Sequence, residues 1–281
     1  MYKNFIRSLV TVGFLAMFSL AQAQVGNVTG DLGTTCQSTG TIMTASGACT
    51  FTPTAYKISI FEMGLCTANP FGAAQTGTTF DRTSCVTTYA DAAPVTVDVA
   101  ASLGGAPISL TGTSTPPAEN TYTHAYMMMG DTFTVSGSFV NGANTFVSRA
   151  DGSATTGIGN IQEAANNLTN FGDGTNCDSG FLNVPVSSGT MSAFITNAAL
   201  VRSVRTGGAA GNPSVCANSG RLTGVMTLTT PVVVTSDTLQ VVFNFDLTNQ
   251  GVQFFDDAGN DSVPDAFGSG PFSGSFTVIN N

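Results

Sequence analysis

The sequence predicts an all-β protein, an antiparallel β-sandwich with one short helix in a long connection. The first observation is the stretch 238–248, where the large apolar residues alternate with mostly polar ones: Leu239, Val241, Phe243, Phe245 and Leu247. This alternation is the period of a half-buried strand. The second observation is that most other patterned segments are short strands of the same kind. Because their apolar faces need a covering layer, strands at this spacing predict a sandwich.

The N-terminal residues have the features of an export signal. Lys3 and Arg7 precede a mostly apolar run at 9–20, and Ala21-Gln22-Ala23 matches a small-x-small cleavage site. The alternative is a retained membrane anchor, but a run of about 12 residues is shorter than the ~20 that a spanning helix needs. We therefore expect residues 1–23 to be a signal peptide and the mature, secreted chain to begin at Gln24. No later stretch is long and apolar enough for a transmembrane helix.

The charge of the mature chain excludes some partners. Residues 1–23 hold two of the eight basic residues and none of the 17 acidic ones, so the remainder carries a formal charge of −11. Nucleic acid and anionic lipid are poor partners for such a chain. Charged residues make up only 9% of the sequence, against ~25% in ordinary soluble domains. A surface with so few charges favours contacts with neighbouring proteins.

Six cysteines lie in the mature part, and an even number behind an export signal predicts disulfide bonds. Sequential pairing is favoured, because each pair brackets a loop rich in small polar residues: Cys36–Cys49, Cys66–Cys85 and Cys177–Cys216. Metal ligation is the rival interpretation. No C-x-x-C motif is present, and His124, the single histidine, is far from every cysteine in the sequence.

The mature chain divides into an extended N-terminal arm at 24–53 and a β-sandwich at 54–281, with a loop and helix insertion around 150–220. Ala55–Cys66 is the first firm strand, and its apolar residues change face after Ile60, as at a β-bulge. Residues 94–99 alternate cleanly. Residues 121–129 and 132–139 are predicted to form a hairpin around Gly130-Asp131.

The only predicted helix lies at 160–172. Asn160 and Glu163 resemble a capping box, and the apolar residues that follow recur at helical spacing. Residues 181–204 fit either a strand or a short helix. Further strands are expected at 222–228, 231–235, 238–247 and 272–279.

Three segments in this order resemble the prealbumin-like β-sandwich domains of bacterial surface proteins: TAYKISIFEMGLC at 54–66, PPAENTYTHAYMMM at 116–129 and LQVVFNFDL at 239–247. That family usually carries a Pro-x-Gly-x-Tyr turn before the middle strand. Here Pro117 and Tyr122 are present, but the glycine is missing and the spacing differs. The resemblance implies a sandwich at the cell surface. It transfers no active site, because function in that group is mostly unassigned.

Few residues suggest catalysis or cofactor binding. His124 lies in strand register with Tyr122 and Tyr126, and no G-x-S-x-G or phosphate-binding glycine motif occurs. An acidic loop offers oxygen ligands of the kind that Ca²⁺ prefers, although the same residues also build ordinary turns: Asp256, Asp257, Asn260, Asp261 and Asp265. No cofactor is expected to be required.

These features predict a non-enzymatic, secreted or cell-surface structural protein, such as a fibre, matrix or surface-layer subunit. It would act through self-assembly or contacts with other surface proteins. The alternative is a glycan-binding or adhesin module, with Ca²⁺ as its cation. A hydrolase without a recognisable motif comes third.

Overall fold

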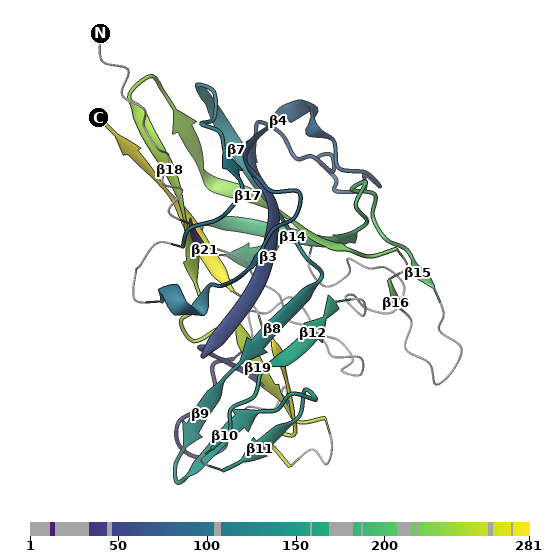
Figure 1. The fold of residues 1–281 in the computed structure, drawn as a ribbon, viewed down its shortest axis with the longest axis vertical. Coiled ribbons are helices and arrows are strands. Elements are labelled where there is room, and N and C mark those ends of the chain that lie inside the picture. The colour runs from purple at the N-terminus through teal and green to yellow at the C-terminus, as the bar shows by residue number, and fades with distance from the viewer. Residues whose placement is uncertain are drawn as a thin grey trace.

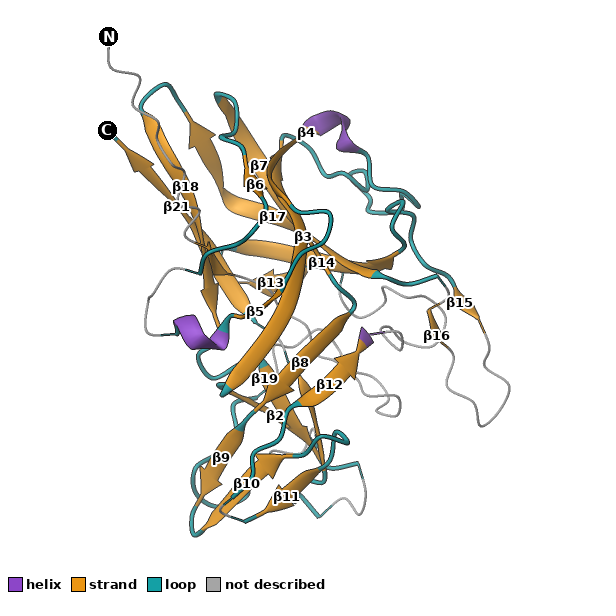
Figure 2. Cartoon of the chain, viewed as in Figure 1, coloured by secondary structure: helices purple, strands orange, loops and turns teal. Residues whose placement is uncertain are grey.

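A computed structural model describes the chain at 12–14, 34–43, 47–103, 108–157, 159–168, 182–186, 188–206, 215–216, 218–257, 261–270 and 272–281. The described residues form an all-β, antiparallel sandwich, as predicted (Figure 1). Two short helical turns among them, η1 and η2, are three-residue 3-10 helices at Arg82–Ser84 and Ala100–Ser102 (Figure 2). No helix among these residues has the length and apolarity of a membrane span.

The first layer is a ten-stranded antiparallel sheet. Its main path has the order β12-β8-β3-β7-β17-β14-β13, while β4 and β5 pair with β3, and β6 pairs with β4. The bounds are β3 Ala55–Cys66, β4 Cys85–Ala90, β5 Thr96–Asp98, β6 Thr113–Ser114, β7 Asn120–Met129, β8 Thr132–Ser136, β12 Ala164–Asn167, β13 Val184–Val186, β14 Gly189–Thr196 and β17 Arg221–Val234.

Two small sheets cover the inner face of this layer. One is β1-β18-β21 and the other is β2-β19-β20. Their strands are β1 Val12–Phe14, β2 Ala48–Phe51, β18 Thr238–Asp246, β19 Val252–Phe255, β20 Ala266–Ser269 and β21 Ser273–Asn280. Ring contacts join the layers: Tyr56 of β3 lies 6.2 Å from Phe245 and 5.4 Å from Phe272, between ring centroids. The core therefore lies between the sheets, as in a sandwich.

Two further pairings complete the described strands. The sheet β11-β10-β9 stands at the bottom of Figure 1, with β9 Ser138–Asn141, β10 Asn144–Ser148 and β11 Ala154–Thr156. The pair β15–β16 joins Arg205–Thr206 to Val215–Cys216.

The bulge predicted in β3 is present. The register against β7 shifts between Ile60 and Glu62. Before the shift, Ile58 and Ile60 are buried in the main core, and after it Met63 and Leu65 are. Phe61 packs instead on a second apolar cluster on the other face of the sheet. The extra residue at the bulge thus lets β3 direct apolar side chains into the main core both before and after it.

The predicted hairpin around Gly130-Asp131 is wrong. Both β7 and β8 run antiparallel to β3, β7 beside Ile60–Cys66 and β8 beside Ala55–Lys57. The amide of Gly130 donates to the carbonyl of Ser59, at 2.9 Å between nitrogen and oxygen. The chain therefore continues from β7 into β8 along the same edge of β3. Gly130-Asp131 is an insertion between these two strands and does not reverse the direction of the chain.

The predicted helix at 160–172 is also wrong. Ala164–Asn167 is strand β12, which pairs with the edge strand β8. Ala164 and Asn166 are buried while Ala165 and Asn167 are exposed, a period of two. Asn166 is held by Ser269 of β20, whose backbone amide donates to its Oδ1 at 3.0 Å. The open edge of β8 and this buried contact outweigh the helical spacing of a few apolar residues. The ambiguous segment 181–204 contains two strands, β13 and β14.

The second half of the sequence-predicted arm packs on the domain. The amide of Cys36 donates to the carbonyl of Thr50, and the amide of Thr50 donates to the carbonyl of Thr34. Ile42 and Met43 are buried in the main core. Residues 34–43 therefore run beside β2 as part of the folded body.

A candidate strand-binding edge

A cavity of about 130 Å³ lies between the start of β18 and the inner face of the large sheet. Its upper wall contains Leu239, Val241 and Phe243 of β18, with Phe276 of β21. Ser114–Pro117 line its side. Its floor carries methionines from four adjacent strands: Met63, Met127, Met129, Met191 and Met226. An apolar cavity of this size is large enough for a group close to benzene in volume.

Strand register explains the methionine floor. Met63 of β3 lies opposite Met127 of β7, and Met226 of β17 lies opposite Met191 of β14. Residues opposite each other on neighbouring strands share a face of the sheet. Gly224 stands between these pairs, opposite Met127, and supplies no side chain to fill the space. Unbranched thioether side chains adapt to what they contact, so this floor suits an added apolar group.

The edge of β18 lies above this cavity. On one side β18 pairs with β21, and on the other with β1, and no other described strand pairs with it. From Thr238 to Phe245 it contains no charged residue and no proline. Leu239 is 46% exposed, and Val241 and Phe243 are only half-buried.

The two ends of the main path of the large sheet carry features that discourage strand addition. The outer strand β13 has three residues, including Pro185, and β12 at the other end of the main path has only four. Short edge strands, proline and charges protect natural sheets from pairing with another chain. β18 has nine residues, contains no proline and no charge before its last residue Asp246, and lies over the apolar cavity, so we identify it as the candidate functional edge.

Comparisons with known proteins identify no relative of this chain. Family models, curated proteins and solved structures were all compared with the chain, and none of them matches. The resemblance to prealbumin-like surface domains stays a prediction.

Two of the three predicted disulfides are present. Cys36 bonds to Cys49 and Cys66 to Cys85, with S–S distances of 2.03 and 2.07 Å. Cys216 is also disulfide-bonded. Its predicted partner, Cys177, lies outside the described residues, so that pair stays a prediction. Disulfides are typical of proteins outside the cytoplasm.

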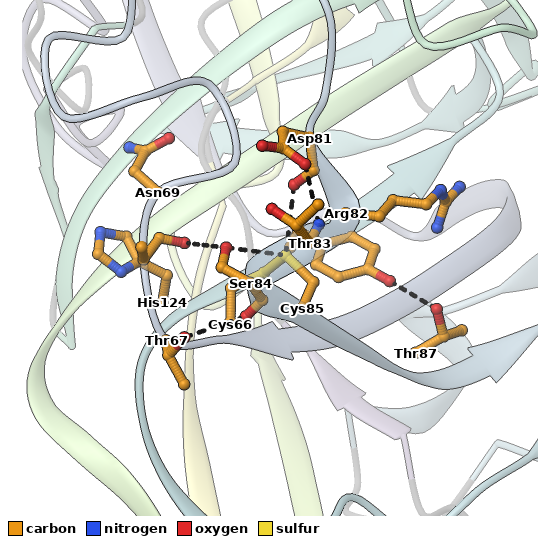
Figure 3. The surroundings of a disulfide bond; sticks show 12 residues. Cys66, Thr67, Asn69, Asp81, Arg82, Thr83, Ser84, Cys85, Thr87 and His124 are labelled. Atoms are coloured by element: carbon orange, nitrogen blue, oxygen red, sulfur yellow. Dashed lines mark hydrogen bonds between the residues drawn. A yellow bond between two sulfur atoms is a disulfide. The ribbon is translucent and has the colours of Figure 1, made fainter.

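His124 lies beside the Cys66–Cys85 bridge (Figure 3) and directly opposite Cys66 across the β3–β7 pair. Burial lowers the pKa of its imidazole. The side-chain hydrogen bond described for it joins Nδ1 to the hydroxyl of its neighbour Thr123, at 2.9 Å. This contact orients the ring within the strand.

The acidic loop forms a network of turns. The Asp265 carboxylate accepts from the amide of Asp257 at 2.9 Å, and Asp256 accepts from the amide of Ser262 at 2.7 Å. Burial, and then the nearby Asp265 and Asp256, raise the pKa of Asp257. Asp261 accepts from the amide of Val263 at 3.0 Å, and Asn260 lies outside the described residues. Within the described chain, no group of three acidic, histidine or cysteine side chains is placed to hold a metal.

A half-buried cluster around Glu62 was not predicted from the sequence. Glu62 accepts hydrogen bonds from Arg82 at 2.8 Å, from Tyr126 at 2.6 Å and from Thr87 at 3.1 Å. Burial by itself would raise the pKa of Glu62, but the bonds from Arg82, Tyr126 and Thr87 outweigh it and lower that pKa. These residues come from β3, η1, β4 and β7, so only the register of the strands brings them together. They tie the disulfide loop to the sheet.

Proposed function

We propose that this protein is a non-enzymatic, secreted or cell-surface structural protein that acts through protein–protein contacts. It assembles with other copies, or with other surface proteins, when an extended strand adds to the edge of β18. The observation that carries the proposal is the combination of this long, uncharged edge with the apolar cavity beneath it. In strand addition, main-chain hydrogen bonds supply affinity and side-chain pockets supply selectivity.

Two other features support this role. The disulfides favour an oxidising compartment outside the cytoplasm. Only 9% of the residues are charged, so few charged groups lose their hydration when a neighbouring subunit packs against this surface. The charges nearest to β18 in the sequence are Asp237, directly before the strand, and Asp246, its last residue.

The test places a charge on the edge of β18. Leu239→Lys leaves folding intact because Leu239 is 46% exposed. An added strand would cover this side chain, and a lysine there would have to lose its hydration. We expect assembly of the chain from Gln24, measured by light scattering and electron microscopy, to weaken by roughly tenfold or more, a change of about 1.4 kcal/mol.

Val140→Lys is the matched control. Val140 is 56% exposed and lies on β9, in the separate sheet with β10 and β11. The same change of charge there should leave assembly unaltered. Assembly of Leu239→Lys at the level of the unmodified chain would contradict the proposal.

A further inference from the structure

The chain itself shows what kind of strand the edge of β18 accepts. β1 lies parallel to β18, with Val12 opposite Phe243 and Phe14 opposite Phe245. Phe243 and Phe245 are two of the β18 residues that pack against the main core. The segment seated on this edge belongs to the leader that the sequence predicts to be removed.

The sequence around β1 has the pattern of a strand. From Val10 to Phe14, apolar residues alternate with small or polar ones: Val10, Val12 and Phe14 are separated by Thr11 and Gly13. This run contains no charged residue and no proline, so every residue in it has a backbone amide to donate. An extended segment of this kind presents one apolar side, while its main chain pairs with a sheet edge.

Without β1, the layer above the methionine floor contains only β18 and β21 among the described strands. A two-stranded sheet is marginal unless it packs against other elements. Leu239 and Ile279, at 46% and 41% exposure, show that this small sheet is incompletely covered. A third strand beside β18 widens the layer and protects the edge from unwanted pairing.

We infer that the edge of β18 is a binding site for a single extended strand with an apolar residue at every second position, and that β1, at Val12–Phe14 of the same chain, occupies it until the leader is removed. The inference rests on the proposed role of β18 as the assembly edge. Removal of the leader uncovers the edge, so assembly begins only after export. The leader thus has a second role, as a strand that covers the assembly edge.

The first experiment measures hydrogen exchange of β18 amides in the full chain. A variant with Val12→Pro and Phe14→Pro cannot donate at these two positions of β1. Amides of β18 should exchange at least tenfold faster in this variant than in the unmodified chain, because the edge is open. Ser19→Pro, in the same leader but outside β1, is the matched control and should leave β18 protected. Equal exchange in all three chains would overturn the inference.

The second experiment adds the strand to the chain that begins at Gln24, which retains every described strand except β1. The probe is a labelled peptide of residues 10–20 with a solubilising lysine tail. The control peptide carries the two prolines. Two lost main-chain hydrogen bonds correspond to roughly thirtyfold weaker binding. Equal binding of both peptides would contradict the inference.

The two proposals fail in different ways. If the peptide binds β18 but the chain from Gln24 never assembles, the proposed function is wrong and the binding site stands. If that chain assembles through β18 but neither binds the peptide nor is inhibited by it, the function stands and the role of β1 is wrong.

Discussion

Three buried tyrosines offer a graded test of how hydroxyl groups stabilise this fold. Tyr56, Tyr122 and Tyr126 are all at most 4% exposed. The hydroxyl of Tyr126 donates to the Glu62 carboxylate at 2.6 Å, and that of Tyr122 donates to the carbonyl of Ala118 at 2.8 Å. The hydroxyl of Tyr56 is buried with no hydrogen-bond partner among the described residues. Replacing each with phenylalanine removes one oxygen and little volume.

The expected changes in the free energy of unfolding differ in size and in sign. Tyr126→Phe should lose about 1.5–3 kcal/mol, because its bond is to a charged group. Tyr122→Phe should lose roughly 0.5–1.5 kcal/mol, the range for a neutral bond. Tyr56→Phe should gain roughly 1 kcal/mol, because an unsatisfied hydroxyl no longer has to be buried. Urea unfolding at pH 7, with the disulfides kept intact, measures all three.

The pH dependence of the unfolding free energy distinguishes the bond from Tyr126 to the Glu62 carboxylate from the neutral bond of Tyr122. The pKa of Glu62 is lowered in the folded state. Its stabilising contribution is therefore present above the unfolded-state pKa, near 4.5, and is lost as the pH falls through the folded-state value. The cost of Tyr126→Phe should shrink over that interval, while the cost of Tyr122→Phe stays constant. A loss for Tyr56→Phe as large as that for Tyr126→Phe would refute this reasoning.

Two further predictions concern the disulfide loop and the acidic loop. Replacing Cys66 and Cys85 together with alanine should lower the free energy of unfolding by about 3 kcal/mol, as expected for a separation of 19 residues, and urea titration measures the loss. Asp257→Asn should raise the melting temperature at pH 7, by less than about 1 kcal/mol in stability, because the raised pKa of Asp257 means that its charge opposes folding. The gain should vanish in acid below pH 3.8, and Asp237→Asn, on another exposed turn, is the control. A melting temperature lowered by Asp257→Asn only when Ca²⁺ is present would instead support the predicted calcium site.

Local patterns predicted much of the framework. Strand β3 has the bounds that its alternation predicted, and its bulge appears where the apolar residues change face. This agreement has a physical reason. A strand with one buried side must place apolar residues at every second position, so the sequence pattern shows which side chains are buried. Two disulfides were predictable for a similar reason, because each closes a short loop.

Long-range pairing decided the features that local patterns misjudged. Gly130-Asp131 has the composition of a hairpin turn, yet the edge of β3 accepts both flanking strands in the same direction. The segment 164–167 has apolar residues at helical spacing, yet an unpaired edge of β8 and a buried contact to Ser269 make it a strand. In both cases the deciding hydrogen bonds come from residues distant in the sequence.

The candidate site depends both on the local sequence pattern and on the tertiary structure. The sequence by itself determined the period of β18, its lack of charge before Asp246 and the mostly apolar run in the leader. Only the tertiary structure placed methionines of four strands under β18 and left Gly224 between them, because a cavity is a property of packing between layers. Only the structure also showed that an edge of β18 lies over this cavity, because an edge exists only once the strand order is set.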